Sequence, residues 1–151
     1  MTELVEVQLL QLPLDLLARA QEHSEELRRE FQLIASPQTD DTSVPARLLA
    51  LSQQLSGRYG MYTQEADRVI AAARERGEDS VDVTMSVPDS AGDAARALGA
   101  MLAEADAFCR DGDLLTLATP EELVRLREWY LDQFITQIEG GPPVPWPQYP
   151  G

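Results

Sequence analysis

The sequence predicts a helix-rich α+β fold, in which about four helices, one of them long, pack on a small two- or three-stranded sheet. Apolar residues recur every three or four positions over four long stretches, which is the period of a helix with one buried face. Two shorter stretches alternate apolar and polar residues, which is the period of a strand. Because the 151 residues hold no repeat and no long linker, we expect one domain over residues 1–139 and a proline-rich tail over residues 140–151.

The alternating stretches are residues 4–12 and 80–88. In the second stretch the apolar side chains occupy the odd positions and the polar ones the even positions, so one face is buried. In the first stretch Leu10 and Leu12 break the alternation, and we expect the end of this strand to be covered on both sides. The apolar run 114–117 is the candidate third strand.

Four helices are predicted, and most have a recognisable signal at one end. Their approximate ranges are 13–35, 45–76, 91–110 and 120–139. The second helix would be about 48 Å long at 1.5 Å per residue. Gly57 and Gly60 near its centre predict a kink or a short break. Thr119 and Pro120 open the last helix with the pattern of a capping box and a proline in the first turn.

The charge of the chain is strongly negative, because 12 basic residues stand against 26 acidic ones and the formal net charge is -14. This balance argues against binding to nucleic acid or to an anionic membrane surface. No apolar run is long enough to span a bilayer, and the acidic start of the chain and its single cysteine predict a cytoplasmic protein. All cations are arginine, which favours a GC-rich bacterial genome, with an acid-adapted halophile as the alternative.

His23 is the only histidine, and it lies near the middle of the apolar stripe of the first predicted helix. A histidine beside acidic residues on a long helix is typical of phosphoacceptors in phosphorelay proteins. A phosphoacceptor must face solvent to meet its kinase, whereas this position faces inward. We therefore favour a partly buried histidine that forms a hydrogen bond in the core, and we keep a phosphorelay role as the alternative.

The residues needed for enzyme chemistry are scarce. A zinc site usually needs several cysteines or histidines, and this chain has one of each. Cys109 falls on the apolar face of the third helix, where we expect a small buried side chain. Neither a phosphate-binding glycine loop nor a lysine is present. We predict a protein that is not an enzyme and that has no cofactor and no metal site.

Arg127 lies on the buried side of the last predicted helix, between Leu123 and Tyr130. A buried guanidinium group needs an acidic partner, so we favour a structural ion pair. The alternative is that Arg127 binds an anionic ligand. In that case the protein is a small-molecule sensor whose pocket lies between the sheet and the helices.

Trp129 is predicted to point outward from the last helix, on the side opposite to Arg127. An outward tryptophan is either covered by another segment or marks a contact surface. Five prolines in the last ten residues predict an extended polyproline tail, which also carries Trp146 and Tyr149. We therefore expect these three aromatic residues either to dock the tail on its own domain or to bind a partner protein.

The long helix over residues 45–76 is the second candidate surface. Its regular apolar stripe exceeds what one compact domain of this size needs. Pairing with the first helix, and with a second copy of the chain in a homodimer, would use its full length.

Two segments, VEVQLLQLPLDLLARAQEHSEELRREF and LLTLATPEELVRLREWYLDQFITQI, resemble small uncharacterised actinobacterial proteins. Proteins of that group accompany ATPase-type anti-sigma factors and their antagonists in partner-switching signalling. The resemblance covers about a third of the chain. It implies a cytoplasmic regulatory role and a partner that is an anti-sigma ATPase or its antagonist, and it assigns no catalytic residue. The leading prediction is therefore a non-enzymatic regulatory module that binds another protein.

Overall fold

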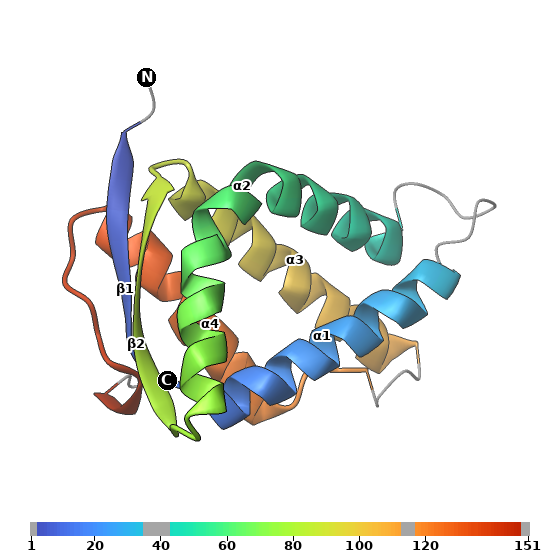
Figure 1. Ribbon diagram of the computed structural model, residues 1–151. Helices are drawn as coiled ribbons and strands as arrows, with labels where there is room; N and C mark the ends of the chain where they lie inside the picture. Colours follow the sequence, from blue (N-terminus) through green and yellow to red (C-terminus); the bar gives the residue numbers. More distant parts are fainter. Residues whose placement is uncertain (1–2, 35–42, 113–116, 149–151) are drawn as a thin grey trace.

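The computed structural model describes residues 3–34, 43–112 and 117–148, and it has the predicted helix-rich α+β architecture (Figure 1). Four α-helices pack on one antiparallel pair of strands. In chain order the elements are β1 (Leu4–Pro13), α1 (Leu14–Ile34), α2 (Val44–Glu75), β2 (Ser80–Pro88), α3 (Ala91–Asp111), α4 (Glu121–Ile138) and the short 3₁₀ turn η1 (Trp146–Gln148). The candidate third strand lies almost entirely outside the described residues. No described helix is long and apolar enough to cross a membrane.

A bulge in β1 explains why the sequence alternation breaks in this strand. Leu9 pairs with Val83 and Leu12 with Val81, so β1 has an extra residue between these two pairs. Gln11 takes a positive φ of 57° there, and its backbone N–H donates to Asp82 Oδ1 at 2.8 Å. The extra residue turns Leu12 back to the inner face, where it is fully buried with Leu9.

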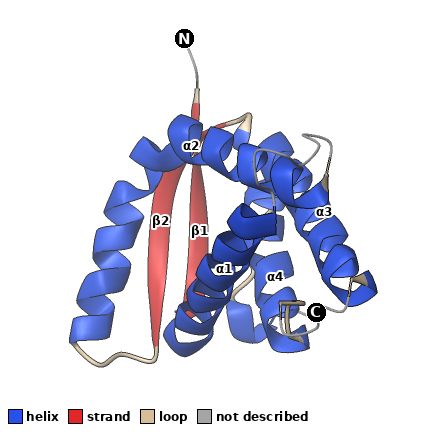
Figure 2. Ribbon diagram, turned by 90° about the vertical axis from the view of Figure 1, so that its right-hand side faces the viewer, coloured by secondary structure: helices blue, strands red, loops and turns tan. Residues whose placement is uncertain are grey.

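The long helix α2 is one continuous helix with a marked bend near its middle (Figures 1 and 2). Gly60 lies in this region, and the Thr63 hydroxyl donates to its carbonyl oxygen at 3.0 Å. Before the bend, Leu48 packs in a cluster with Phe31 of α1; after it, Ile70 packs in the cluster that contains both strands. The apolar stripe is thus used along its length within the chain, and the homodimer stays a prediction.

The inner face of the sheet and α4 form the main core. Val7, Val83 and Trp129 are among its most buried side chains. The second cluster lies between α1, α3 and the first part of α2. Helix α4 packs against both α1 and α3, and the candidate site lies between these three helices.

Candidate functional site

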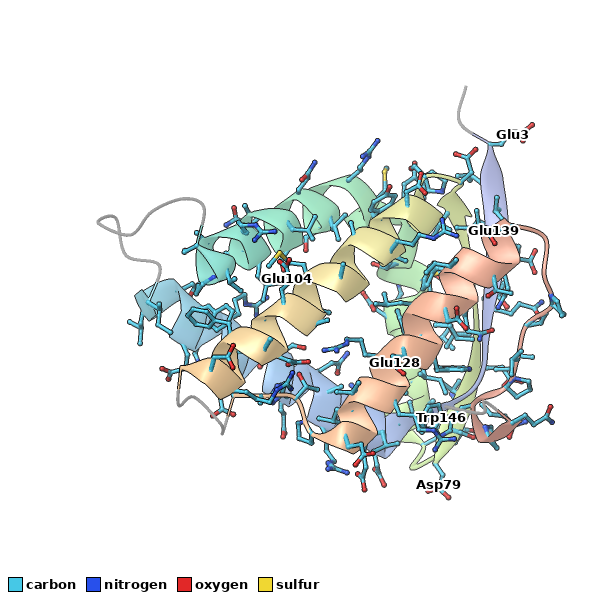
Figure 3. All side chains as sticks on the ribbon, turned by 180° about the vertical axis from the view of Figure 1, so that it is seen from behind. Glu3, Asp79, Glu104, Glu128, Glu139 and Trp146 are labelled. Carbon is cyan, nitrogen blue, oxygen red and sulfur yellow. The ribbon has the colours of Figure 1, made fainter. Side chains whose placement is uncertain are left out.

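A cavity of about 590 Å³ lies between α1, α3 and α4. Figure 3 shows the molecule from the side on which α3 and α4 are in front, with Glu104 labelled on α3 and Glu128 on α4. Most of the wall is apolar. The apolar lining residues are Leu17, Ala20, Leu27, Leu98, Leu102, Leu123, Leu126 and Leu131. A mostly apolar cavity of this size, with a few polar groups, is typical of small-molecule sites.

Four polar side chains from distant parts of the sequence form a connected chain at the wall of the cavity. The Nε2 atom of His23 lies 3.3 Å from the hydroxyl oxygen of Thr119. That hydroxyl lies 2.6 Å from Asp106 Oδ1, and the other carboxylate oxygen of Asp106 lies 3.1 Å from Arg127 Nη2. The chain therefore links α1, α3 and α4, and it brings together the two polar residues, His23 and Arg127, that the sequence singled out.

Thr119 does not cap α4, and the predicted capping box is wrong. Pro120 occupies the N-cap position, where no side-chain hydrogen bond forms. Both the backbone N–H and the hydroxyl of Thr119 bond instead to Asp106 Oδ1, at 3.1 and 2.6 Å. The charged Asp106 carboxylate is a strong acceptor, and its two bonds hold Thr119 in place, while the first N–H groups of α4 receive no side-chain cap.

The hydrogen-bond chain fixes the role of the His23 Nε2 atom. The Asp106 carboxylate can only accept, so Thr119 donates its single hydroxyl proton to Oδ1. The hydroxyl oxygen can then only accept a hydrogen bond from His23, so the Nε2 atom is the donor of this bond. His23 is half-buried, as the favoured prediction had it. In this arrangement His23 cannot remove a proton from Thr119.

Arg127 has the acidic partner that its buried position required, namely Asp106. The Arg127 and Asp106 side chains are only 18% and 6% exposed, respectively. Asp106 is satisfied by Arg127 on one oxygen and by Thr119 on the other. The guanidinium group has five N–H donors, of which the ion pair uses few, so Arg127 can bind a ligand in the cavity without leaving Asp106.

Basic side chains outnumber acidic ones on the cavity wall, in contrast to the whole chain, and one of them, Arg127, is paired with Asp106, which does not line the cavity. Arg28 and Arg127 line the cavity, whereas Glu25 is the single acidic residue among the described lining residues. Arg28 is exposed and forms no ion pair with any residue of the described ranges. In a chain with 26 acids and 12 arginines, such a wall favours an anion.

Tyr130 on the cavity wall gives a prediction about pH. Burial, followed by the negative charge of Asp67, raises the pKa of Tyr130 to about 12. The unfolded chain loses this proton near pH 10, so the folded state is stabilised below that pH and loses the contribution as the pH rises from about 10 to about 12. We expect the unfolding free energy, measured by denaturant titration in this window, to fall more steeply for the wild type than for Tyr130→Phe. Equal slopes would contradict this assignment.

Trp129 does not point into solvent, and its predicted exposure is wrong. It is fully buried, because the chain after α4 turns back and covers it. Trp146 packs edge-on against Trp129 with ring centroids 5.6 Å apart, and the Nε1 atom of Trp129 donates to the Val144 carbonyl oxygen at 2.7 Å. The tail therefore docks on its own domain, the first of the two predicted outcomes. Tyr149 lies outside the described residues.

Two buried glutamines of α4 were missed by the sequence analysis. Gln137 bonds to both backbone groups of Gln8 in β1, as acceptor from the N–H and as donor to the C=O, each at 2.8 Å. It thereby pairs part of the free edge of the sheet. Gln133 accepts from Gln137 and from the Val144 N–H, at 3.0 and 2.9 Å. Gln133 and Gln137 follow Trp129 by four and eight residues on the same face of α4, and this spacing was the one available signal.

The remaining candidate groups are accounted for by packing. Cys109 is fully buried, and burial raises the pKa of its thiol, so it behaves as a small apolar side chain. Within the described ranges, no group of three or more histidine, cysteine or acidic residues is placed to hold a metal ion.

Comparison with known proteins gives no assignment: no family model, no curated protein and no solved structure matches the chain.

Proposed function

We propose that the chain is a non-enzymatic regulatory module that binds a small amphipathic carboxylate in the cavity between α1, α3 and α4. One observation carries this proposal: a mostly apolar cavity has cationic and hydrogen-bonding groups on its wall, in a chain that is otherwise strongly acidic. The volume of about 590 Å³ is in the usual range for a small ligand.

Different lining residues suit the two parts of such a ligand, its hydrocarbon body and its carboxylate. The leucines of α1, α3 and α4 supply apolar surface for a hydrocarbon body, whose burial is favourable by about 25 cal/mol per Å². Arg28 supplies a charge that forms no ion pair with a described residue, and Arg127 supplies further N–H donors that the Asp106 ion pair holds in place. A carboxylate suits such donors because guanidinium groups bind it with matching geometry.

The hydrogen-bond chain supports a binding role in preference to catalysis. In a catalytic triad the histidine accepts the nucleophile's proton, and an acid orients the histidine. Here Asp106 accepts directly from the Thr119 hydroxyl, and His23 donates to the oxygen of that same hydroxyl. A phosphorelay role would require the imidazole to leave its half-buried contact, so we do not adopt it.

The regulatory part of the proposal concerns a protein partner. The resemblance to proteins of partner-switching systems supports an anti-sigma ATPase or its antagonist as that partner, in a cytoplasmic bacterial setting. The ligand would then act by changing the packing of α1 against α4, because both helices line the cavity.

Thermal unfolding with octanoate tests the proposal, with octanol at the same concentration as the uncharged control. We expect octanoate at about 100 times its dissociation constant to stabilise the protein by about 2.7 kcal/mol, a rise of several degrees in melting temperature, and octanol to do much less. Arg28→Leu should reduce the rise by at least half. Arg29→Leu is the matched control, because Arg29 is exposed on the same helix and does not line the cavity.

Each variant is compared with its own melting temperature in the absence of ligand. Leu98→Trp fills the apolar part of the cavity and should abolish the rise. Equal stabilisation by octanoate and octanol, or a rise that survives both Arg28→Leu and Leu98→Trp, would rule out the proposed site.

A further inference from the structure

The C-terminal tail leaves the end of α4 through a sharp turn at Gly140 and Gly141, which directs it back along the helix. Gly140 has a positive φ of 98°, and the Gly141 N–H donates to the Thr136 carbonyl oxygen at 2.8 Å. A Cβ atom on Gly141 would lie 2.6 Å from Thr136 Cγ2, so only glycine fits there. The tail then runs back beside β1 (Figure 1).

The side chains of α4 hold the tail mainly by its backbone. Val144 lies between Pro143 and Pro145, so its peptide N–H is the only one in residues 142–145. That N–H donates to Gln133 Oε1 at 2.9 Å, and the Val144 carbonyl oxygen accepts from Trp129 Nε1 at 2.7 Å. We call Arg125, Trp129 and Gln133 the tail-binding face of α4.

An aromatic side chain adds the second point of recognition. Trp146 packs edge-on against Trp129, and the guanidinium group of Arg125 lies 4.8 Å from its ring centroid (Figure 3 labels Trp146). Hydrogen bonds to a free peptide group, with aromatic contacts beside it, are how extended proline-rich peptides are recognised in other proteins. None of these contacts requires the peptide to be joined to α4.

We infer that the tail-binding face of α4 is a recognition site for extended proline-rich segments, and that such a segment of a partner protein replaces the tail. In the partner segment a single non-proline residue lies between two prolines and supplies the free peptide N–H. An aromatic residue lies two positions after it. It is neutral or basic, because the chain is strongly acidic and the tail has no charged side chain. The tethered tail competes at a high effective concentration and keeps the site closed until that segment is present.

The turn at residues 140–141 favours a partner protein over tail exchange between two copies. This turn places the tail directly on its own helix through the Gly141 hydrogen bond. Exchange would require the turn to open in both copies, whereas a separate peptide needs only to displace residues 142–148.

Fluorescence anisotropy of a labelled peptide with the sequence of residues 141–151, measured as the 151-residue chain is added, tests this inference. Val144→Pro in the protein removes the peptide N–H that donates to Gln133 Oε1, and it leaves the side chains of the tail-binding face unchanged. We expect this variant to bind the peptide about tenfold or more tightly than the wild type does, because its own tail competes less well. A peptide with the same valine-to-proline change should bind the variant at least about tenfold more weakly.

Circular dichroism confirms that the variant is folded, and Trp146→Ala in the protein provides a second way to weaken the tail. Equal peptide affinity for the wild type and both folded variants would overturn the inference. A wild-type protein that light scattering shows to be a dimer, and that the peptide converts to monomers, would overturn it in favour of tail exchange between copies.

Discussion

Replacing Trp129 with alanine is expected to destabilise the protein by about 3–5 kcal/mol. Trp129 is the largest of the fully buried side chains, and it packs in the main core against Trp146. The substitution creates a cavity and removes the hydrogen bond to Val144, so the tail loses one of its two backbone contacts. Denaturant unfolding followed by circular dichroism measures the change.

Trp146→Ala is the matched control for this prediction. Trp146 is half-buried and contributes an edge-on aromatic contact, so its loss should cost about 1–2 kcal/mol. If both substitutions cost the same, Trp129 would stabilise the protein only through the tail. If Trp129→Ala cost less than about 1 kcal/mol, the burial of this residue would be contradicted.

Replacing Arg127 with leucine is the second substitution with a large expected effect, about 3–5 kcal/mol of lost stability. It leaves the carboxylate of Asp106 buried without its cationic partner. Thr119 still donates to Asp106 Oδ1, but two donors to one oxygen do not neutralise the charge. The unfolding free energy in denaturant measures the loss.

The double variant Asp106→Asn with Arg127→Leu separates the charge from the packing. Asparagine keeps an acceptor for Thr119 and removes the unpaired charge, so the double variant should recover a substantial part of the stability. If it is as unstable as Arg127→Leu alone, the effect arises from lost packing of the arginine side chain, and the proposed role of the ion pair is wrong.

The fold class and nearly all element boundaries were predictable from the sequence. The four helices and both strands begin and end within a few residues of the predicted positions, because their apolar periods record which face is buried. The bulge in β1 was visible only as a broken alternation at Leu10 and Leu12. Its cause, a bond from Gln11 to Asp82 across the sheet, depends on a residue 71 positions away.

The orientation of Trp129 could not be predicted because α4 is covered on more than one side. A helical wheel assumes one buried face, whereas here the tail buries a second one. Gln133 and Gln137 are of a residue type that is mostly exposed in proteins, yet both are buried against peptide groups of the tail and of β1. Such partners can be found only when the path of the tail is known.

The candidate site was predictable only in parts. His23 and Arg127 were recognised as inward-facing polar residues, each in need of a partner. The connection between them was missed, since Thr119 matched a helix cap and Asp106 gave no local signal. Thr119 lies 96 positions from His23, and local patterns carry no information on such a contact.

We propose that the cavity binds an amphipathic carboxylate through the arginines of its wall. Calorimetric titration of octanoate into the wild type, Arg28→Leu and Arg29→Leu tests it most directly. We expect saturable binding with one ligand per chain, at least about tenfold weaker in Arg28→Leu and unchanged in Arg29→Leu, since a charged hydrogen bond contributes about 1.5–3 kcal/mol. No saturable heat with the wild type, or equal affinities in all three proteins, would contradict the claim.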